Sequence, residues 1–496
     1  MGFFFLSNTI LQIAILAVLI TASKCLVHGA ETPRLSIITD KEALISFKSG
    51  IDPETLGFLL TWDQTLSPCN WTGVRCNDEV GARVVELDLS DLGLKGSISP
   101  HIGNLSFLRS LQLQNNQLMG VIPQNISRCT ELEILDLGNN EISGRIPEEL
   151  SDLSRLQKLK QLDLTINNLT GTIPGFLHNL TTIQVIRMAH NLLHGTVPPG
   201  LGNLPELQMY DIGFNRIVGV GDNGLDFLTS LTNSTRLNFL AVDGNLLEGV
   251  IPESIGNLPK VLEKLYMGGN RIHGGIPASI GHLSGLTLLS LSYNSISFDI
   301  PQEIGHLEEL RTLELAGNNL SGKIPTSLGS LKNLFNIDLS GNELEGTIPT
   351  SFENFQTLLS LDLSCNKLNG SIPKEILNLR SLSTHLDLSN NLLTGPLPQE
   401  IGTLDSLIAI DLSNNGLSET IPDSIGGYQV LDPVLVPTDS SLSYDGQSIA
   451  PEAQHDCLIG ILGVGLSCAV DSPDVRISMR DALCKLRSIR ETLLKT

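Results

Sequence analysis

One pattern, LxLxxNxLxGxIP, recurs along most of this chain and constrains its fold more than any other feature. Its Asn falls at Asn116, Asn140, Asn167, Asn191, Asn215, Asn245, Asn270, Asn294, Asn318, Asn342, Asn366, Asn391 and Asn415. Leu92 takes this position in an irregular first copy, and nine of the 13 spacings are 24 residues. Such a period indicates a stack of similar units, because each unit buries its apolar face only against its neighbours. We predict one elongated array of about 14 repeats over residues 85–427.

The chemistry of each copy predicts where its parts lie. In the LxL segment the Leu side chains point inward and the residue between them faces out, as in a strand. The Asn amide bonds backbone groups at the turn, which a Leu cannot do. The segment after Ile-Pro, for example residues 280–283, is expected to form 3₁₀ or short helical turns on the convex side.

These units are leucine-rich repeats, and their GxIP form resembles the plant extracellular type. The predicted fold class is an α/β repeat solenoid: a superhelix or horseshoe with a concave parallel sheet. We expect a helical N-terminal cap at one end and a short helical C-terminal tail at the other.

The amino-acid composition limits the classes of molecule that this solenoid is expected to bind. Hydrophobic residues make up 41% of the 496 residues and aromatics only 4%, which fits a core of repeated small aliphatic side chains. The 31 Lys and Arg against 53 Asp and Glu give a formal net charge of −22. Nucleic acid and anionic lipid both require a basic footprint, so we predict neither as a partner.

The N-terminus carries a targeting signal. Residues 11–20 form an apolar run too short to span a membrane, and we predict a signal peptide over residues 1–29. The alternative is a buried N-terminal helix. No later stretch reaches the ~20 apolar residues of a transmembrane helix, so no membrane span is predicted. A secreted, apoplastic location permits disulfides and N-glycans. The N-x-S/T sequons begin at Asn70, Asn104, Asn125, Asn168, Asn179, Asn233, Asn319 and Asn369.

Residues 30–84 precede the regular repeats and are predicted to form the N-terminal cap. Residues 40–51 have helical apolar spacing, and the segment CNWTGVRC follows at residues 69–76. Their order and spacing resemble the N-terminal cap of plant leucine-rich-repeat receptors. The resemblance implies a disulfide between Cys69 and Cys76. Cys129 and Cys365 fall within repeats, where we expect buried thiols.

The spacing of 30 between Asn215 and Asn245 contains an insertion, called here the island, near residues 216–240. It resembles the segment of the receptor-kinase subfamily that includes the bacterial elongation-factor receptor and the rice blight-resistance receptor. Its residues 219–224 formally match GxGxxG. They interrupt a solenoid rather than join a strand to a helix, so we do not predict a phosphate site.

The tail at residues 428–496 does not continue the repeat. Leu483, Leu486, Ile489 and Leu493 have helical spacing, and the segment resembles the last helices of the kinase domain in the same subfamily. No Gly-rich loop followed by a V-A-I-K strand, and no H-R-D or D-F-G segment, occurs in the chain, although phosphoryl transfer needs these parts together. We therefore expect an incomplete kinase remnant, and no enzyme activity as the chain is written. No cofactor or metal is predicted.

The outward residue of LxL is Asp in most repeats, which we interpret as a solvated family feature. Repeats 5 to 9, counted with Leu92 as repeat 1, depart from it. Exposed aromatics together with Arg are the usual anchors of an interface. We predict one ligand-binding patch on the concave face, formed by Arg187, His190, Met209, Asp211, Phe214, Phe239, Tyr266 and Tyr293.

The leading hypothesis is the extracellular recognition module of a plant receptor-like protein. It would bind a peptide or microbial-pattern ligand in immune or developmental signalling. The resemblance implies a leucine-rich-repeat co-receptor kinase as a further partner. A second hypothesis is an incomplete record of a membrane receptor serine/threonine kinase, located at the plasma membrane. A third is a secreted inhibitor of microbial wall-degrading enzymes.

Overall fold

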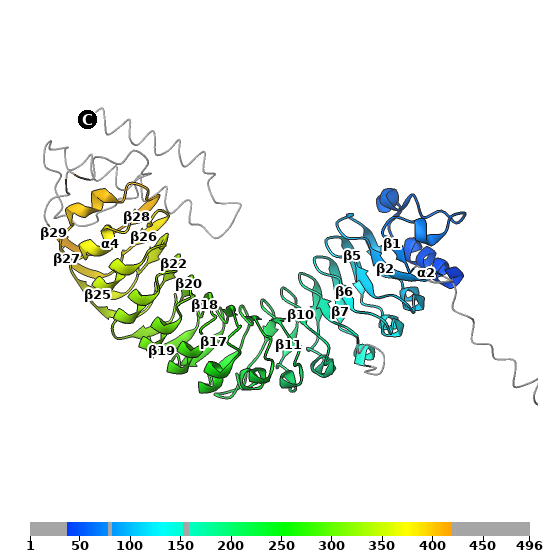
Figure 1. Cartoon of the computed structure of the whole chain (residues 1–496), viewed down its shortest axis with the longest axis horizontal. Helices are drawn as coiled ribbons and strands as arrows, with labels where there is room; N and C mark the ends of the chain where they lie inside the picture. Colours follow the sequence, from blue (N-terminus) through cyan, green and yellow to red (C-terminus); the bar gives the residue numbers. More distant parts are fainter. Residues whose placement is uncertain (1–36, 78–81, 152–157, 419–421, 423, 425–496) are drawn as a thin grey trace, which may run out of the picture.

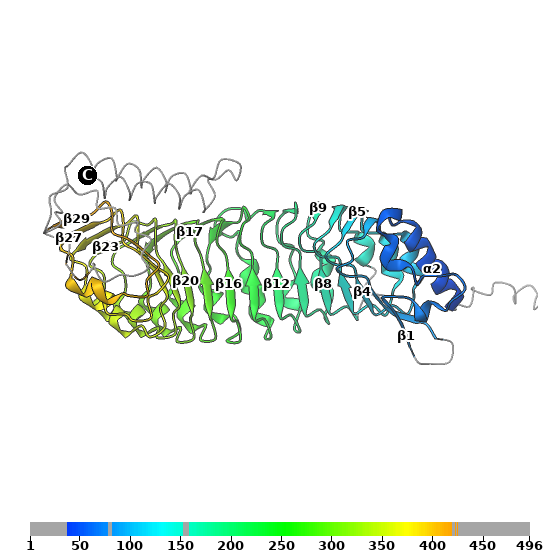
Figure 2. The ribbon, with the colours of Figure 1, turned by 90° about the horizontal axis from the view of Figure 1, so that it is seen from above.

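The computed structural model describes residues 37–77, 82–151, 158–418, 422 and 424. These residues form an open arc whose inner side is lined by one long sheet (Figure 1). Seen from above, the strands of this sheet lie side by side along the arc, and the N-terminal cap covers one end of the solenoid (Figure 2). The predicted α/β leucine-rich-repeat solenoid is confirmed.

The inner sheet has 15 strands, of which all but the first pairing are parallel. β1 (Val74–Cys76) belongs to the cap and runs antiparallel to β2 (Val84–Asp88). One strand per repeat then follows: β4 (Ser110–Gln112), β6 (Ile134–Asp136), β8 (Gln161–Asp163), β10 (Val185–Arg187), β12 (Met209–Asp211), β14 (Phe239–Ala241), β16 (Lys264–Tyr266), β18 (Leu288–Ser290), β20 (Thr312–Glu314), β22 (Asn336–Asp338), β24 (Ser360–Asp362), β26 (His385–Asp387) and β28 (Ala409–Asp411).

Each inner strand presents two side chains to the concave face. We call the residue before the first Leu outward position 1 and the residue between the two Leu outward position 2. In β10, Val185 and Arg187 hold these positions and are half-buried, while Ile186 between them is buried. The register pairs position 1 with position 1 in neighbouring strands, so side chains form rows along the arc.

The Asn of the repeat pattern joins each repeat to the one before it. The Asn116 side chain accepts a hydrogen bond from the Leu94 N–H at 2.9 Å and donates to the Leu89 carbonyl at 2.8 Å. The other Asn of the pattern bond equivalent groups one repeat earlier, down to Asn415. Because these backbone groups are buried, an unpaired one would cost about 1–3 kcal/mol. A Leu at this position could not satisfy them.

The convex side consists of short turns. The 3₁₀ helices η3 (Pro100–Asn104), η4 (Gln124–Arg128), η5 (Glu148–Ser151), η6 (Gly175–Asn179), η7 (Leu201–Asn203), η9 (Glu253–Asn257), η10 (Ala278–His282), η11 (Gln302–His306), η12 (Thr326–Ser330), η13 (Thr350–Asn354) and η14 (Gln399–Thr403) lie there, with the α-helix α4 (Lys374–Leu377). In most of them the Pro of Ile-Pro stands at the N-cap, for example Pro277. Its fixed φ and missing N–H suit the start of a turn.

A second set of strands forms the flank of the arc in four separate parallel sheets. The first comprises β3 (Lys95–Ser97), β5 (Gln117–Val121), β7 (Glu141–Arg145) and β9 (Asn168–Thr170). The second is β11 (His194–Gly195) with β13 (Arg216–Ile217). The third holds β15 (Glu248–Val250), β17 (Arg271–Gly274), β19 (Ser295–Asp299) and β21 (Asn319–Ser321), and the fourth β23 (Glu345–Gly346), β25 (Lys367–Gly370), β27 (Leu392–Pro396) and β29 (Gly416–Ser418).

The island interrupts the flank at β13. It folds as a loop followed by α3 (Phe227–Ser230) and η8 (Leu231–Asn233). Among the described residues, the flank pairing between β13 and the next repeat is reduced to an isolated bridge of Val218 with Leu246, while Ile217 still donates to the Asn245 side chain and accepts from the Leu246 N–H. The inner sheet continues past the island without a break, so the concave face of repeats 5 to 9 is one surface.

The cap combines the helix α2 (Ile37–Ser49) with η1 (Pro53–Leu59) and η2 (Pro68–Asn70). Trp62 lies between Phe47 and Trp71, with ring centroids 6.3 and 5.2 Å away. Cys69 and Cys76 form the disulfide that the family resemblance implied. These groups cover the Leu ends of the first repeat, which a solenoid must shield from water.

Two predictions about cysteine burial have different outcomes. Cys129 is buried, as expected for a thiol inside a repeat. The prediction for Cys365 is wrong, because this residue is exposed at the turn immediately before Asn366. The signal peptide at residues 1–29 and the tail at 428–496 lie outside the described residues. Within the described part of the chain, no helix has the length and apolar character to cross a bilayer.

Candidate functional site: the concave face of repeats 5 to 9

The Asp at outward position 2 has a local structural role. Its Oδ1 accepts the backbone N–H two residues ahead, as in Asp136 with Gly138 at 3.1 Å and Asp338 with Ser340 at 3.0 Å. This turn ends the strand and satisfies a donor that the sheet leaves unpaired. The same bond forms at Asp88, Asp163, Asp211, Asp362, Asp387 and Asp411. The Asp row is therefore a feature of the fold as well as a source of charge.

Arg187 breaks this row in repeat 5. The register places it between Asp163 and Asp211, and its Nη1 donates to Asp163 Oδ2 at 2.8 Å. The Arg187 side chain stays 42% exposed, whereas that of Asp163 is 5% exposed. Among the described residues, Arg187 Nε is buried without a hydrogen-bond partner. The guanidinium is thus held in place by one carboxylate and keeps an open face toward solvent.

Apolar side chains occupy outward position 1 beside Arg187. Met209 of β12 and Phe239 of β14 are direct neighbours in the register, and both are half-buried. Phe239 contacts the Tyr266 ring with centroids 5.6 Å apart, and Lys264 Nζ lies 6.0 Å from the Phe239 centroid. These side chains form a continuous surface over β12, β14 and β16.

A third row follows at the residue immediately before each pattern Asn, here called the turn position. Its backbone is left-handed throughout, and most repeats place Asn, Asp or Gly there. Ile166, His190, Phe214 and Tyr293 are the large exceptions of repeats 4, 5, 6 and 9, with φ from 51 to 56°. The His190 and Phe214 rings stack at 4.3 Å with 6° between their planes.

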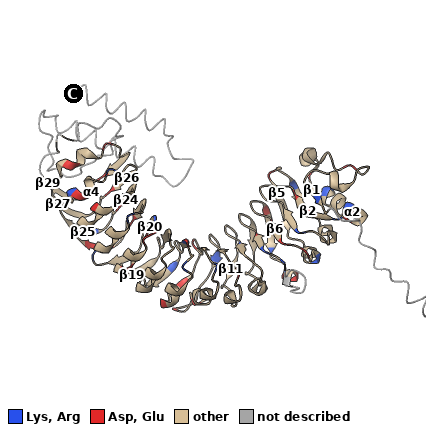
Figure 3. Cartoon of the chain, viewed as in Figure 1, with Lys and Arg blue, Asp and Glu red and all other residues tan. Residues whose placement is uncertain are grey.

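Burial changes the acidity of carboxyls around Arg187. Desolvation raises the pKa of Asp136 to about 6, and the neighbouring Asp163 and Asp88 charges add to this effect. Desolvation also raises the pKa of Asp211 and of Asp243, although the Gly213 N–H and Arg187 counteract it at Asp211. Figure 3 shows that charged residues are otherwise scattered along the arc.

The structure brings most of the eight predicted residues together. Arg187, Asp211, Met209, Phe239 and Tyr266 lie on four consecutive inner strands, and His190 and Phe214 form the adjoining stack. Tyr293 lies farther along, since Gly244 and Gly269 occupy the turn positions of the two repeats between it and Phe214. Sequence reasoning missed Ile166 and Lys264. A β-branched residue at a turn position that most repeats fill with Asn, Asp or Gly was the available signal for Ile166.

The eight sequons lie away from the inner sheet. Asn104, Asn125, Asn179 and Asn233 belong to convex 3₁₀ turns, and Asn70 to the cap. The flank strands β9, β21 and β25 carry the remaining three, Asn168, Asn319 and Asn369. Six of the eight Asn are exposed, while Asn104 and Asn125 are half-buried. Their glycosylation stays a prediction.

The repeat register, the inner sheet and the cap define a leucine-rich-repeat solenoid with a capped N-terminal end. The model described as "Leucine rich repeat N-terminal domain" matches residues 37–77. Models described as leucine rich repeat match residues 106–160 and 260–320, and also 158–180, 333–355, 357–379, 384–404 and 406–428. The chain belongs to the leucine-rich repeat family.

Its relatives include plant receptor kinases. A receptor-like protein kinase of Arabidopsis thaliana is 47% identical over 87 residues, which is 18% of this chain and 8% of the relative. The LRR receptor-like serine/threonine-protein kinase EFR of the same plant is 44% identical over 84 residues, 17% of this chain and 8% of EFR. The matched part thus spans less than a tenth of these relatives' own length.

Solved structures show the same architecture. The plant peptide hormone receptor RGFR1, in complex with RGF2, has a TM-score of 0.62 at 36% identity, over 71% of this chain and 57% of that one. The LRR ectodomain of the receptor kinase GASSHO1/SCHENGEN3 from Arabidopsis thaliana, in complex with CASPARIAN STRIP INTEGRITY FACTOR 2, has a TM-score of 0.58 at 30% sequence identity. This match covers 79% of this chain and 54% of that one. An LRR protein of Leptospira interrogans has a TM-score of 0.53 at 31% sequence identity, and the match covers 65% of this chain and 76% of that one.

Proposed function

We propose that this chain is the extracellular recognition part of a plant receptor-like protein and binds a peptide ligand on the concave face of repeats 5 to 9. The observation that carries the proposal is the surface around Arg187, where a half-exposed guanidinium on β10 shares the concave face with Met209, Phe239 and Tyr266 of the next three strands. Arg and aromatic residues in partly desolvated settings are the side chains that supply most binding energy at interfaces. Two of the similar solved structures are receptors in complex with their ligands.

The rows define the chemistry of such a ligand. A carboxylate of the ligand would meet the open face of Arg187, while a basic group would meet Asp211, one strand further along. An apolar side chain would cover Met209 and Phe239, and a second would cover the His190–Phe214 stack. A short peptide with mixed charge and at least two large apolar side chains fits this arrangement. A purely anionic polymer does not, because acidic side chains dominate the row.

Recognition rather than catalysis is the role that we propose for this chain. Signalling would then depend on a separate kinase, for which a leucine-rich-repeat co-receptor is our candidate. An immune or a developmental role is open to experiment. We further propose an apoplastic location, with the N-glycans on the convex and flank sides.

A second candidate is that the chain is part of a longer membrane receptor serine/threonine kinase. The receptor-kinase relatives, which are far longer than the matched segments, favour it. Sequencing full-length transcripts across the codons for Gly427 and Tyr428 tests this candidate. Further repeats, a membrane span and kinase motifs at this junction would support it, and a mature message with the junction as written would contradict it.

The binding proposal is tested with the secreted full chain and a pool of synthetic plant secreted peptides. Arg187→Ala, Phe239→Ala and Tyr266→Ala are combined in one variant. The control combines Glu253→Ala, Glu353→Ala and Lys374→Ala on the convex side. We expect the first variant to lose at least about tenfold in affinity for any peptide that wild type binds, because single anchors are worth about 2 kcal/mol. Equal binding by all three proteins would contradict the proposed site.

A further inference from the structure

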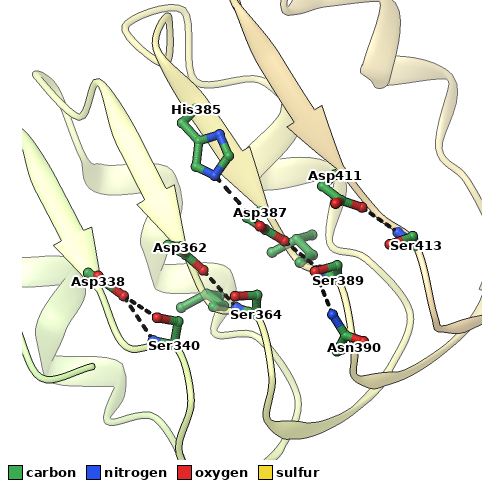
Figure 4. A network of polar contacts seen from close by, with 12 residues as sticks. Asp338, Ser340, Asp362, Ser364, His385, Asp387, Ser389, Asn390, Asp411 and Ser413 are labelled. Carbon is green, nitrogen blue, oxygen red and sulfur yellow. Dashed lines mark hydrogen bonds and ion pairs between the residues drawn. The ribbon is translucent and has the colours of Figure 1, made fainter. Parts of the chain in front are cut away.

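A second group of chemically active side chains lies on the concave face near the last repeats. Asp362 of β24, and His385 and Asp387 of β26, offer one carboxylate oxygen or imidazole nitrogen each, and these atoms lie within 4.8 Å of one another. Figure 4 shows the three side chains side by side on neighbouring strands. The group lies several strands away from the surface around Arg187, which is centred on β10 to β16.

The inner-sheet register creates this cluster. Asp362 and Asp387 are directly paired at outward position 2, while His385 holds outward position 1 of the same strand as Asp387. The corresponding position-1 residues of the neighbouring strands are Ser360 and Ala409, which carry no ring. His385 therefore places an imidazole next to the row of Asp at outward position 2. This row continues with Asp338 on one side of the cluster and Asp411 on the other.

Each carboxylate has one oxygen engaged before any ligand arrives. Asp362 Oδ1 accepts the Ser364 N–H at 2.9 Å, and Asp387 Oδ1 accepts the Ser389 N–H at 2.9 Å. These bonds hold one oxygen of each carboxylate and leave the other oxygen for a further contact. His385 Nε2 lies 3.7 Å from Asp387 Oδ2, so the ring already faces that oxygen (Figure 4). Ligating carboxylates in metal sites are held in the same way by outer hydrogen bonds.

We propose that Asp362, His385 and Asp387 bind a divalent transition-metal ion such as Zn²⁺ on the concave face. Two carboxylates and a neutral imidazole balance the charge of the ion and are ligands that Zn²⁺ accepts. The imidazole disfavours Ca²⁺ and Mg²⁺, which take oxygen ligands. Three protein ligands leave the remaining coordination positions open toward the concave face.

The distances are compatible with this ion after small side-chain movements. Zn²⁺ binds carboxylate oxygen and imidazole nitrogen at about 2.0–2.2 Å, so the ligand atoms must come within roughly 3.5 Å of one another. All three side chains are half-buried at the surface of the sheet and can turn about their χ angles without moving the buried Leu of the repeats. An open coordination position would let a carboxylate or imidazole of a bound partner reach the ion.

The test uses the secreted full chain, stripped of metal by a chelator, at neutral pH. ZnCl₂ is titrated by calorimetry, and CoCl₂ serves as a spectroscopic probe through its visible absorption. The test variants are His385→Ala and Asp387→Asn, the second of which can still accept the Ser389 N–H. His273→Ala is the matched control, since His273 Nε2 lies 3.7 Å from Asp222 Oδ1 with no second carboxylate in such a cluster among the described residues. Asp338→Asn controls for the Asp row.

We expect one saturable Zn²⁺ per wild-type chain. His385→Ala and Asp387→Asn should each weaken binding at least about tenfold, because even outer-shell partners of metal ligands are worth 10–100-fold. The visible bands of Co²⁺ should disappear in His385→Ala and persist in His273→Ala. The proposal fails if wild type shows no saturable binding at millimolar Zn²⁺ or if His385→Ala binds like wild type. It also fails if Asp338→Asn weakens binding as much as Asp387→Asn, which would indicate a diffuse counterion atmosphere.

Discussion

The ring of Phe214 lies directly across the backbone of Gly244 in the next repeat. A Cβ atom at Gly244 would stand 2.7 Å from Phe214 Cδ1, closer than side-chain atoms approach one another. Tyr293 and Gly317 are arranged in the same way, since a Cβ atom at Gly317 would stand 2.7 Å from Tyr293 Cδ1. The glycine therefore lets the aromatic ring lie down against the solenoid, while the other face of Phe214 stacks on His190. One residue of the predicted ligand-binding patch is thus positioned by the absence of a side chain in its neighbour.

Replacing Gly244 tests this arrangement. Gly244→Ala should displace the Phe214 ring and also strain a backbone with φ of 60°, which costs about 1–2 kcal/mol by itself. Gly341→Ala is the matched control, because it has the same turn position and a φ of 61° but meets only ordinary contacts. We expect a larger drop in Tm for Gly244→Ala. Equal drops would show that the ring moves aside without cost.

Ile166 carries strain that a different side chain can relieve. It is a β-branched residue at φ 53° and is 49% exposed, so its own packing offsets little of the strain. Ile166→Asn should raise the free energy of unfolding by about 1 kcal/mol, since Asn tolerates this conformation. The Asn could also continue the side-chain bonds from Asn139 to Asn115 and on to Asp91. Thermal unfolding measures the change, and a lower Tm would contradict the strain argument.

The raised pKa of Asp136 predicts a pH dependence of stability. The native carboxyl has a pKa of about 6, against 3.8 for the ordinary value, so the native state binds more protons between these limits. Stability should then fall as pH rises from about 4 to 6. Asp136→Asn, whose Oδ1 can still accept the Gly138 N–H, should reduce this slope and gain about 1 kcal/mol at pH 7, while Asp211 and Asp243, whose pKa values are also raised, retain the rest. Tm values at pH 4 to 7 check it, with the exposed Glu353→Gln as charge control.

The cap contains a buried ion pair with a clear mutational signature. Arg83 donates to both oxygens of Asp40, at 2.8 Å from Nε and 2.6 Å from Nη2, and both side chains are buried. Arg83→Met leaves a buried carboxylate without its cation and should cost about 3–5 kcal/mol. Adding Asp40→Asn should recover most of this loss, because the uncompensated charge is then gone. A double variant no better than Arg83→Met would argue against this account.

Glycan mapping tests the predicted secreted state. Glycopeptide mass spectrometry on the protein from plant cells should find sugar at the exposed sequon residues, among them Asn179, Asn233 and Asn319. Half-buried Asn104 and Asn125 should be occupied less often, because the transferase needs an accessible side chain. Because all eight sequons lie outside the inner sheet, removing the sugars should leave ligand binding on the concave face unchanged. Absence of sugar at every sequon would contradict passage through the secretory pathway.

Much of the fold was predictable from the sequence because each repeat packs against a neighbour of nearly the same sequence and shape. The spacing of Asn116 and its equivalents predicted the repeats, the inward Leu and the convex turns, since each unit meets the same local environment as the next. The cap and its disulfide followed from the resemblance around Cys69 and Cys76. The buried pair of Asp40 and Arg83 did not, because residues 43 apart in sequence leave no periodic trace.

The candidate sites were only partly predictable, for the same physical reason. Arg187, Phe239 and Tyr266 stood out by sequence alone, as departures from a regular slot whose outward direction the strand period determines. The tertiary structure decided which of them meet: that Arg187 is bound by Asp163, that Phe214 rests on Gly244, and that His385 faces Asp387 beside Asp362. Periodicity determines which face a residue lies on, whereas strand register and side-chain rotation determine which atoms come within bonding distance.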